Sequence, residues 1–104
     1  MIEYQAPTDR AYLVGIQSPD EPGDARALLS ELRALTETLG LETVGEETVR
    51  VRDISPRYYL GSGKAEQIAE RARDAEADVL IFDEDLSPSQ QRNWEKLTGA
   101  SVTD

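Results

Sequence analysis

The apolar run from Asp78 to Phe82 (DVLIF) constrains the fold of this chain more than any other feature. The run is short and continuous, and three acids follow it at residues 83–85. Such a run is typical of an inner strand in a parallel sheet, because both faces of that strand are covered. The sequence therefore predicts a sheet that is packed between other elements on both sides.

Leucines mark the first of three predicted helices, which runs from about Asp24 to Leu39. They recur at the helical period, and Gly40 stands where a left-handed C-terminal cap belongs. The stripe that we expect to be buried consists of Leu28, Leu32, Leu35 and Leu39, widened by Leu29.

A second helix is predicted to begin at the glycine-rich turn of residues 61–63. Its buried stripe is made of small residues that allow close packing against a sheet: Ala65, Ile68, Ala69, Ala72 and Ala75.

The third predicted helix begins at Ser87 and runs to about Leu97. Ser87 can cap it, because Pro88 suits the first helical position and Gln90 completes a Ser-x-x-Gln capping box. Gly99 is expected to end this helix.

Three further strands are predicted at Ala11–Gln17, Glu42–Arg52 and Ala100–Thr103, and residues 18–23 form a loop. In the second of these strands, Val49 and Val51 point to one face. The alternating polar residues on the other face are Thr48, Arg50 and Arg52.

Strands and helices alternate along the chain, and this order predicts an α/β domain with right-handed crossovers. We expect a single small domain over residues 11–104, with about four strands in a largely parallel sheet flanked by three helices. Residues 1–10 are expected to be a flexible lead-in.

The net charge of −10 argues against general nucleic-acid binding, which normally shows a basic footprint. Its distribution is uneven, because residues 48–64 carry four basic side chains and one acid, whereas both flanking segments are acidic. We call Arg50, Arg52, Arg57 and Lys64 the basic island.

The basic island is a candidate surface for RNA phosphates, on which Tyr58 or Tyr59 stacks on an unpaired base. In the alternative interpretation, the arginines pair with nearby acids and the tyrosines fill the core. The polar start of the third helix adds Gln91 and Arg92 as candidate RNA contacts; both are equally compatible with an ordinary exposed helix face.

Residues 59–64 (YLGSGK) imitate a phosphate-binding loop without meeting its requirements. A true P-loop has a glycine five residues before the Gly-Lys pair and a Ser or Thr after it, but these positions hold Tyr58 and Ala65. What remains is a turn into a helix start, which attracts anions. The anion-binding candidates are therefore Gly61, Ser62, Gly63 and Lys64. The alternative is that both glycines only let the chain turn without steric cost.

Several kinds of site are excluded by composition. The chain has no cysteine and no histidine, so disulfides, thiolate metal sites and histidine general bases are absent. The acids at residues 83–85 are interpreted as a solvated loop beside a helix start rather than a metal site. No apolar run is long enough to span a bilayer, and we expect a cytoplasmic protein without enzymatic activity of its own.

Three blocks carry a family resemblance: residues 59–64 (YLGSGK), 81–93 (IFDEDLSPSQQRN) and 95–99 (EKLTG). They belong to a resembling stretch from Glu31 to Asp104 which, together with the strand near Ala11, covers nearly the whole chain after residue 10. On these blocks, the chain closely resembles the N-terminal domain of the HflX-type GTPases.

The resemblance implies a ribosome-associated protein, since full-length members bind the large ribosomal subunit, hydrolyse GTP and in some cases split ribosomes. The N-terminal domain would then dock on rRNA at the intersubunit surface, with its own helical linker and G domain as further partners. GTP and Mg²⁺ are expected only in the G domain, so this chain is expected to hold no cofactor. Two alternatives are a module that binds a nucleotide or another anion at residues 61–64, and a regulatory domain that acts on the G domain.

Overall fold

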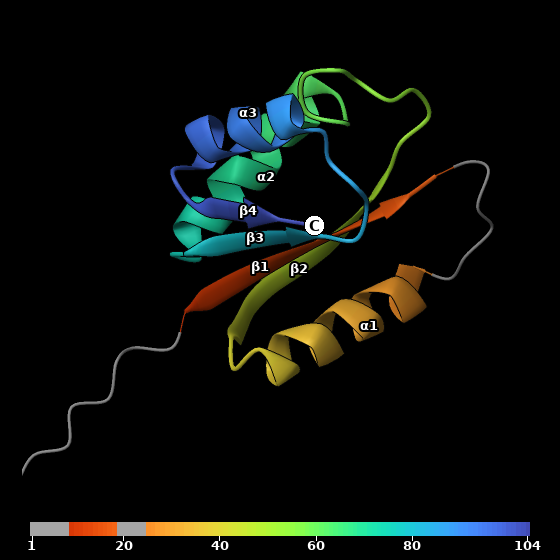
Figure 1. Ribbon diagram of the computed structural model, residues 1–104. Helices are drawn as coiled ribbons and strands as arrows, with labels where there is room; N and C mark the ends of the chain where they lie inside the picture. Colours follow the sequence, from red (N-terminus) through yellow and green to blue (C-terminus); the bar gives the residue numbers. More distant parts are fainter. Residues whose placement is uncertain (1–8, 19–24) are drawn as a thin grey trace, which may run out of the picture.

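The computed structural model describes residues 9–18 and 25–104, which form a four-stranded parallel sheet with helices on both faces (Figure 1). The elements in chain order are β1 (Arg10–Gln17), α1 (Ala25–Thr38), β2 (Glu42–Arg50), α2 (Ser62–Asp74), β3 (Val79–Phe82), α3 (Pro88–Thr98) and β4 (Ser101–Thr103). The strand order is β2-β1-β3-β4. Figure 1 shows α1 on one face and α2 and α3 on the other, which confirms the predicted α/β architecture.

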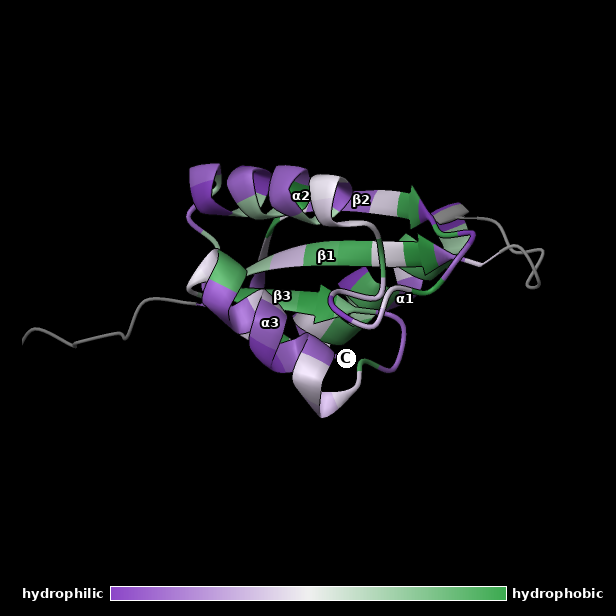
Figure 2. Ribbon diagram, turned by 90° about the horizontal axis from the view of Figure 1, so that it is seen from above, coloured by the Kyte–Doolittle hydropathy of each residue, from purple (hydrophilic) through white to green (hydrophobic). Residues whose placement is uncertain are grey.

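The two central strands, β1 and β3, carry the core. Leu13 of β1 faces α1, whereas Val14 faces α2 and α3, so that both faces of the strand are fully buried. Figure 2 shows hydrophobic residues along β1 and β3 and hydrophilic ones on the outer sides of α2 and α3. The run from Asp78 to Phe82 is therefore an inner strand, as the sequence predicted.

The predicted buried stripe of α1 is wrong in its second half. Leu35 and Leu39 are 44% and 58% exposed, whereas Leu32 and Thr36 are buried. The helix is rotated so that Thr36, rather than Leu35, faces the sheet. The Thr36 hydroxyl lies 2.9 Å from that of Thr43 and donates to the carbonyl of Arg33 at 2.7 Å, so its burial leaves no polar group unpaired.

The helix ends follow the predicted signals. Ser87 and Gln90 form the complete capping box of α3, and Gly99 ends that helix in the left-handed conformation with a φ of 73°. Gly40, which follows α1, has a φ of 75°. The predicted stripe of α2 is buried from Ala65 to Ala72, whereas Ala75 is half-buried at the C-cap.

Some predicted boundaries shift or lie outside the described residues. Residues 1–8 of the predicted lead-in and residues 19–24, which include most of the predicted loop and Asp24, are among those not described. The second strand ends at Arg50 rather than Arg52, and the last begins at Ser101 rather than Ala100. None of the described helices has the length and apolar character needed to cross a membrane.

Candidate nucleic-acid interface

The carboxyl end of β2 and the start of α2 enclose a cleft of about 370 Å³. The cleft is lined by Thr48, Val49, Arg50, Val51, Arg52, Asp53, Leu60, Gly61 and Lys64. Three members of the basic island, Arg50, Arg52 and Lys64, are thus brought together, although they come from different parts of the chain. We call this site the cationic cleft.

The alternation of β2 explains why two arginines share the cationic cleft. Val49 and Val51 are 5% and 6% exposed, because their side chains enter the core between the sheet and α2. Arg50, on the opposite side of the strand, is exposed, and so is Arg52 in the bend that follows β2. The predicted period-two pattern is therefore confirmed.

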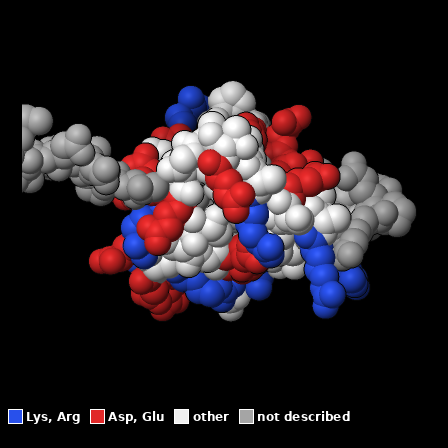
Figure 3. Space-filling view, turned by 90° about the horizontal axis from the view of Figure 1, so that it is seen from below, with Lys and Arg blue, Asp and Glu red and all other residues white. Residues whose placement is uncertain are grey.

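Among the described residues, no acid forms an ion pair with the cations of the cleft. Within residues 9–18 and 25–104, ion pairs are formed by Arg10, Arg33 and Arg71, and none involves a member of the basic island. On the side of the molecule that α1 covers, in contrast, acidic and basic side chains are interspersed (Figure 3). The lining of the cationic cleft thus carries three cations against one acid, Asp53, a local excess of positive charge in a chain whose net charge is −10.

The start of α2 adds backbone donors to one wall of the cleft. Gly61 is the N-cap, with φ −61° and ψ 147°, and no side chain caps the helix. The first N–H groups of a helix have no partner within the helix, and they carry the positive end of its dipole. The first turn contains no acid, and Lys64 lies in it, exposed.

The glycines do not make the turn as the alternative interpretation proposed. Gly61 has a negative φ, and Gly63 lies inside α2. The left-handed residue is instead Tyr59, with a φ of 73°, which is itself paired with Ser55 in an isolated antiparallel bridge. The chain therefore reverses before the glycines, and they have no conformational role there.

The remaining member of the basic island lies outside the cleft lining. The Arg57 guanidinium carbon is 5.0 Å from the centre of the Tyr58 ring, a cation–π contact. Tyr58 itself is only 6% exposed, and its ring meets that of Trp94 edge-on at 5.5 Å between centroids. Its ring belongs to the core and is not open to stacking by a base; Tyr59 is half-buried.

Side chains in the first half of α3 form hydrogen bonds with the segment that precedes α2. Gln90, Asn93 and Trp94 donate hydrogen bonds of 2.8, 2.9 and 2.9 Å to the carbonyls of Ser55, Arg57 and Tyr58. These three bonds hold the segment that precedes the cleft wall.

Gln91 and Arg92, the two predicted RNA contacts of α3, are placed differently from one another. Gln91 donates to the carbonyl of Val102 at 2.6 Å and so covers the outer edge of β4. Arg92 is exposed, and it lines no part of the cationic cleft.

A cluster that the sequence reasoning missed lies beside the cleft. Both carboxylate oxygens of Glu47 accept hydrogen bonds from Arg71, at 2.9 and 2.6 Å, and Oε2 also accepts one from the Tyr12 hydroxyl. Burial by itself raises the pKa of Glu47, but the hydrogen bonds from Arg71 and Tyr12 outweigh it and hold the pKa below its usual value. The positive charge of Lys64 acts in the same direction.

This cluster could have been suspected from the alternation of β2. Glu47 is on the same side of the strand as Val49 and Val51, and an acid on a buried face needs a partner. Because Arg71 and Tyr12 satisfy Glu47, an acid whose charge interacts with that of Lys64 is already neutralised within the protein. The cations of the cleft therefore keep their charge for a partner.

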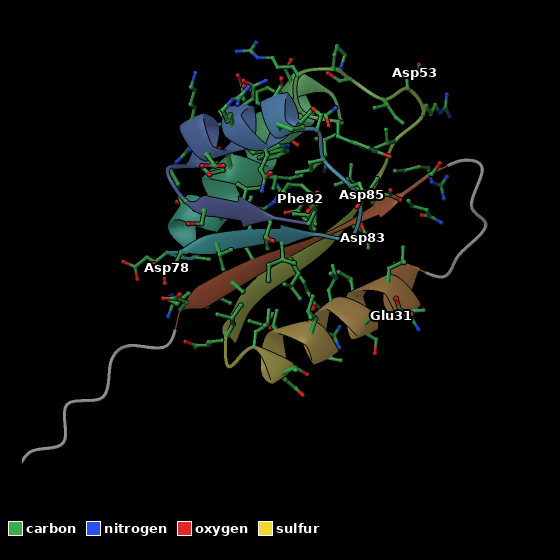
Figure 4. All side chains as sticks on the ribbon, in the orientation of Figure 1. Glu31, Asp53, Asp78, Phe82, Asp83 and Asp85 are labelled. Atoms are coloured by element: carbon green, nitrogen blue, oxygen red, sulfur yellow. The ribbon has the colours of Figure 1, made fainter. Side chains whose placement is uncertain are left out.

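The acids after β3 have a structural use. Asp83 Oδ1 accepts a hydrogen bond of 2.7 Å from the backbone N–H of Ile16, which links the ends of β3 and β1. Figure 4 places Asp83 and Asp85 at the end of β3, apart from Asp53 on the outer bend of the loop after β2. Among the described residues, no group of three acids is arranged to hold a metal ion.

The start of α2 does not fit the nucleotide-and-magnesium chemistry of a P-loop. The position where the Mg²⁺-binding hydroxyl would stand is Ala65, whose side chain is fully buried in the core. What the cleft offers is three cations, one acid (Asp53) and the backbone donors at the start of α2. These suit a phosphate group held without a metal.

The sequence matches a known family over most of its length. The sequence model of the family described as "GTP-binding GTPase N-terminal" matches residues 26–104. A GTPase HflX from Akkermansia muciniphila is 40% identical over 97 residues, which are 92% of this chain and 22% of that protein. A GTPase HflX from Magnetococcus marinus is 38% identical over 105 residues, covering 100% of this chain and 24% of the relative.

The Escherichia coli GTPase HflX is 38% identical over 76 residues, or 73% of this chain and 18% of that protein. The chain thus spans less than a quarter of the length of these curated relatives. It belongs to the GTP-binding GTPase N-terminal family, as an N-terminal domain of the HflX type.

Proposed function

We propose that this domain is the ribosome-docking module of an HflX-like GTPase and that it recognises rRNA without performing chemistry itself. The family supports the assignment to an HflX-like GTPase in the first part, because the relatives are GTPases of which this chain matches only a small part. The composition supports the second, since the chain has neither histidine nor cysteine to serve as a base or nucleophile.

One observation carries the proposal: Arg50, Arg52 and Lys64 line a single cleft, and no acid among the described residues pairs with them. Phosphodiester groups are the dominant partners of such side chains in protein–RNA contacts, because binding releases the counterions that surround the RNA. The many acids elsewhere repel RNA, and this restricts docking to orientations that present the cationic cleft.

Co-sedimentation of the 104-residue chain with large ribosomal subunits, across a series of salt concentrations, tests the proposal. The informative variants are Arg50→Glu, Arg52→Glu and Lys64→Glu, each made singly. Lys96→Glu is the matched control, because Lys96 is exposed on α3, outside the cleft, and its reversal changes the net charge equally.

We expect each cleft variant to bind more weakly than the Lys96→Glu control, with the difference shrinking as salt rises. Arg57→Glu should fall between them, because Arg57 is outside the cleft lining. Equal binding by all the variants would show that net charge alone governs association, and the proposed surface would then be wrong.

The size of the cleft favours a second candidate, a small phosphate-bearing anion at the start of α2. At about 370 Å³, the cleft is within the range of small-molecule sites. Calorimetric titration with ATP, GTP and inorganic phosphates separates the two functions. The second candidate requires saturable binding that disappears in Lys64→Ala, whereas a docking surface for rRNA does not.

A further inference from the structure

Gly61 is a glycine at a position where this fold does not require one. Its backbone angles, φ −61° and ψ 147°, are open to any residue. A Cβ built on Gly61 would meet no atom of the described structure within 4 Å. Gly45, in contrast, is enforced by packing, because a Cβ there would collide with the Tyr12 ring.

The N-cap of α3 shows what this backbone conformation normally supports. Ser87 has φ −66° and ψ 158°, nearly the angles of Gly61, and its side chain accepts a hydrogen bond from the Gln90 N–H. Serine is a better N-cap than glycine, because its oxygen satisfies an N–H group that would otherwise lack a partner. At Gly61 the chain leaves those donors open, although a serine would fit there.

Gly61 also lines the cationic cleft, opposite arginines that belong to a different element. A side chain at this position would project into open space beside the first N–H groups of α2. Glycine is used where a ligand has to approach the backbone closely. The cleft and the bare N-cap are separate observations, and both indicate an anion that reaches the backbone.

We infer that Gly61 is a phosphate-contact residue, kept without a side chain so that a backbone phosphate of bound RNA can reach the α2 N–H groups. The phosphate lies between Lys64 and the two arginines at and just beyond the end of β2, Arg50 and Arg52. The inference rests on the proposed function, which it deepens by naming the group that enters the cleft. It assigns the contact to the backbone of α2 as well as to the cations.

The variant Gly61→Ser tests this inference, because it separates stability from binding. The serine oxygen should cap α2, so the urea midpoint of unfolding should stay equal or rise. The same side chain occupies the phosphate position and competes for the N–H groups. Affinity for large ribosomal subunits should therefore fall roughly tenfold or more, the scale of one charge-assisted hydrogen bond.

Ala34→Ser is the matched control. Ala34 is exposed on α1 and lies outside the cleft lining, so the same side chain is added away from the proposed phosphate position. The control should keep the affinity of the unsubstituted chain and be slightly less stable, because serine favours a helix less than alanine does.

Each outcome decides the inference. Unchanged affinity in Gly61→Ser, or an equal loss in Ala34→Ser, would overturn it, as would a lowered urea midpoint in Gly61→Ser. Saturable binding of inorganic triphosphate that Gly61→Ser abolishes, while subunit binding is kept, would assign the cleft to a free anion instead. If the charge reversals weaken binding but Gly61→Ser does not, the proposed function stands and only this inference fails.

Discussion

The ring of Tyr12 packs directly on Gly45, its partner across β1 and β2. A Cβ at position 45 would lie 2.5 Å from Tyr12 Cε2 and 2.8 Å from Cδ2, distances that real Cβ atoms do not reach. The Tyr12 hydroxyl donates to Glu47, which Arg71 also holds. This packing therefore orders the cluster that neutralises the acid beside the cationic cleft.

Gly45→Ala should destabilise the domain, because the buried Tyr12 ring would have to move away from Glu47. We expect a loss of about 1–3 kcal/mol in the free energy of unfolding, measured with urea. Gly15→Ala is the comparison, since its Cβ would lie at an ordinary 3.5 Å from Leu29 Cδ2. Equal losses in both variants would contradict the proposed Tyr12–Gly45 packing.

The stability of the domain should depend on alkaline pH through Tyr12. Burial, reinforced by the hydrogen bond and the charge of Glu47, raises the pKa of Tyr12 from 10.0 to about 12. The folded state thus keeps this proton to higher pH than the unfolded chain does. The associated stabilisation is fully present below pH 10 and is lost as the pH rises through about 12.

The free energy of unfolding of the unsubstituted chain and of Tyr12→Phe is measured over this pH range. The difference between the two isolates the ionisation of Tyr12 from that of the other tyrosines. The advantage of the unsubstituted chain over the variant should shrink as the pH rises. Two parallel curves would mean that the Tyr12 hydroxyl is not coupled to folding.

Two leucines of α1 should differ in their contribution to stability, because only one of them faces the sheet. Leu32→Ala should cost about 2–4 kcal/mol, because Leu32 is 6% exposed and packs with Leu13 and Ile81. Leu35→Ala should cost less than about 1 kcal/mol, because that side chain is 44% exposed. Urea denaturation of both variants measures the difference, and similar losses would restore the register predicted from the leucine spacing.

Where local chemistry decides the structure, the sequence was a sufficient guide. The run ending at Phe82 forms an inner strand, as its continuous apolar side chains between charged residues predicted. Ser87 and Gln90 form the capping box because each side chain accepts a hydrogen bond from the backbone N–H of the other. The choice of which α1 residues face the sheet depends instead on the side chains that the sheet places opposite them. Thr36 is buried because its hydroxyl finds Thr43, a contact that leucine spacing does not reveal.

The cationic cleft was predictable in part for the same reason. Alternation predicted Arg50 and Arg52 on one side of the chain, but their meeting with Lys64 depends on how α2 packs on the sheet. Tyr58 was open to either interpretation until the Trp94 indole, which donates to its carbonyl, placed it in the core. Gln91 looked exposed in sequence because the β4 edge that it covers is formed by tertiary pairing.

The most direct test of the cationic cleft is the salt dependence of binding to large ribosomal subunits. The unsubstituted chain is compared with a variant in which Arg50, Arg52 and Lys64 are all changed to Gln. Each phosphate contact contributes roughly 0.7–0.9 to the slope of log K against log salt, so the variant should have a slope shallower by about 2. The same slope for both proteins would contradict the account, because the cleft would then take no part in neutralising RNA.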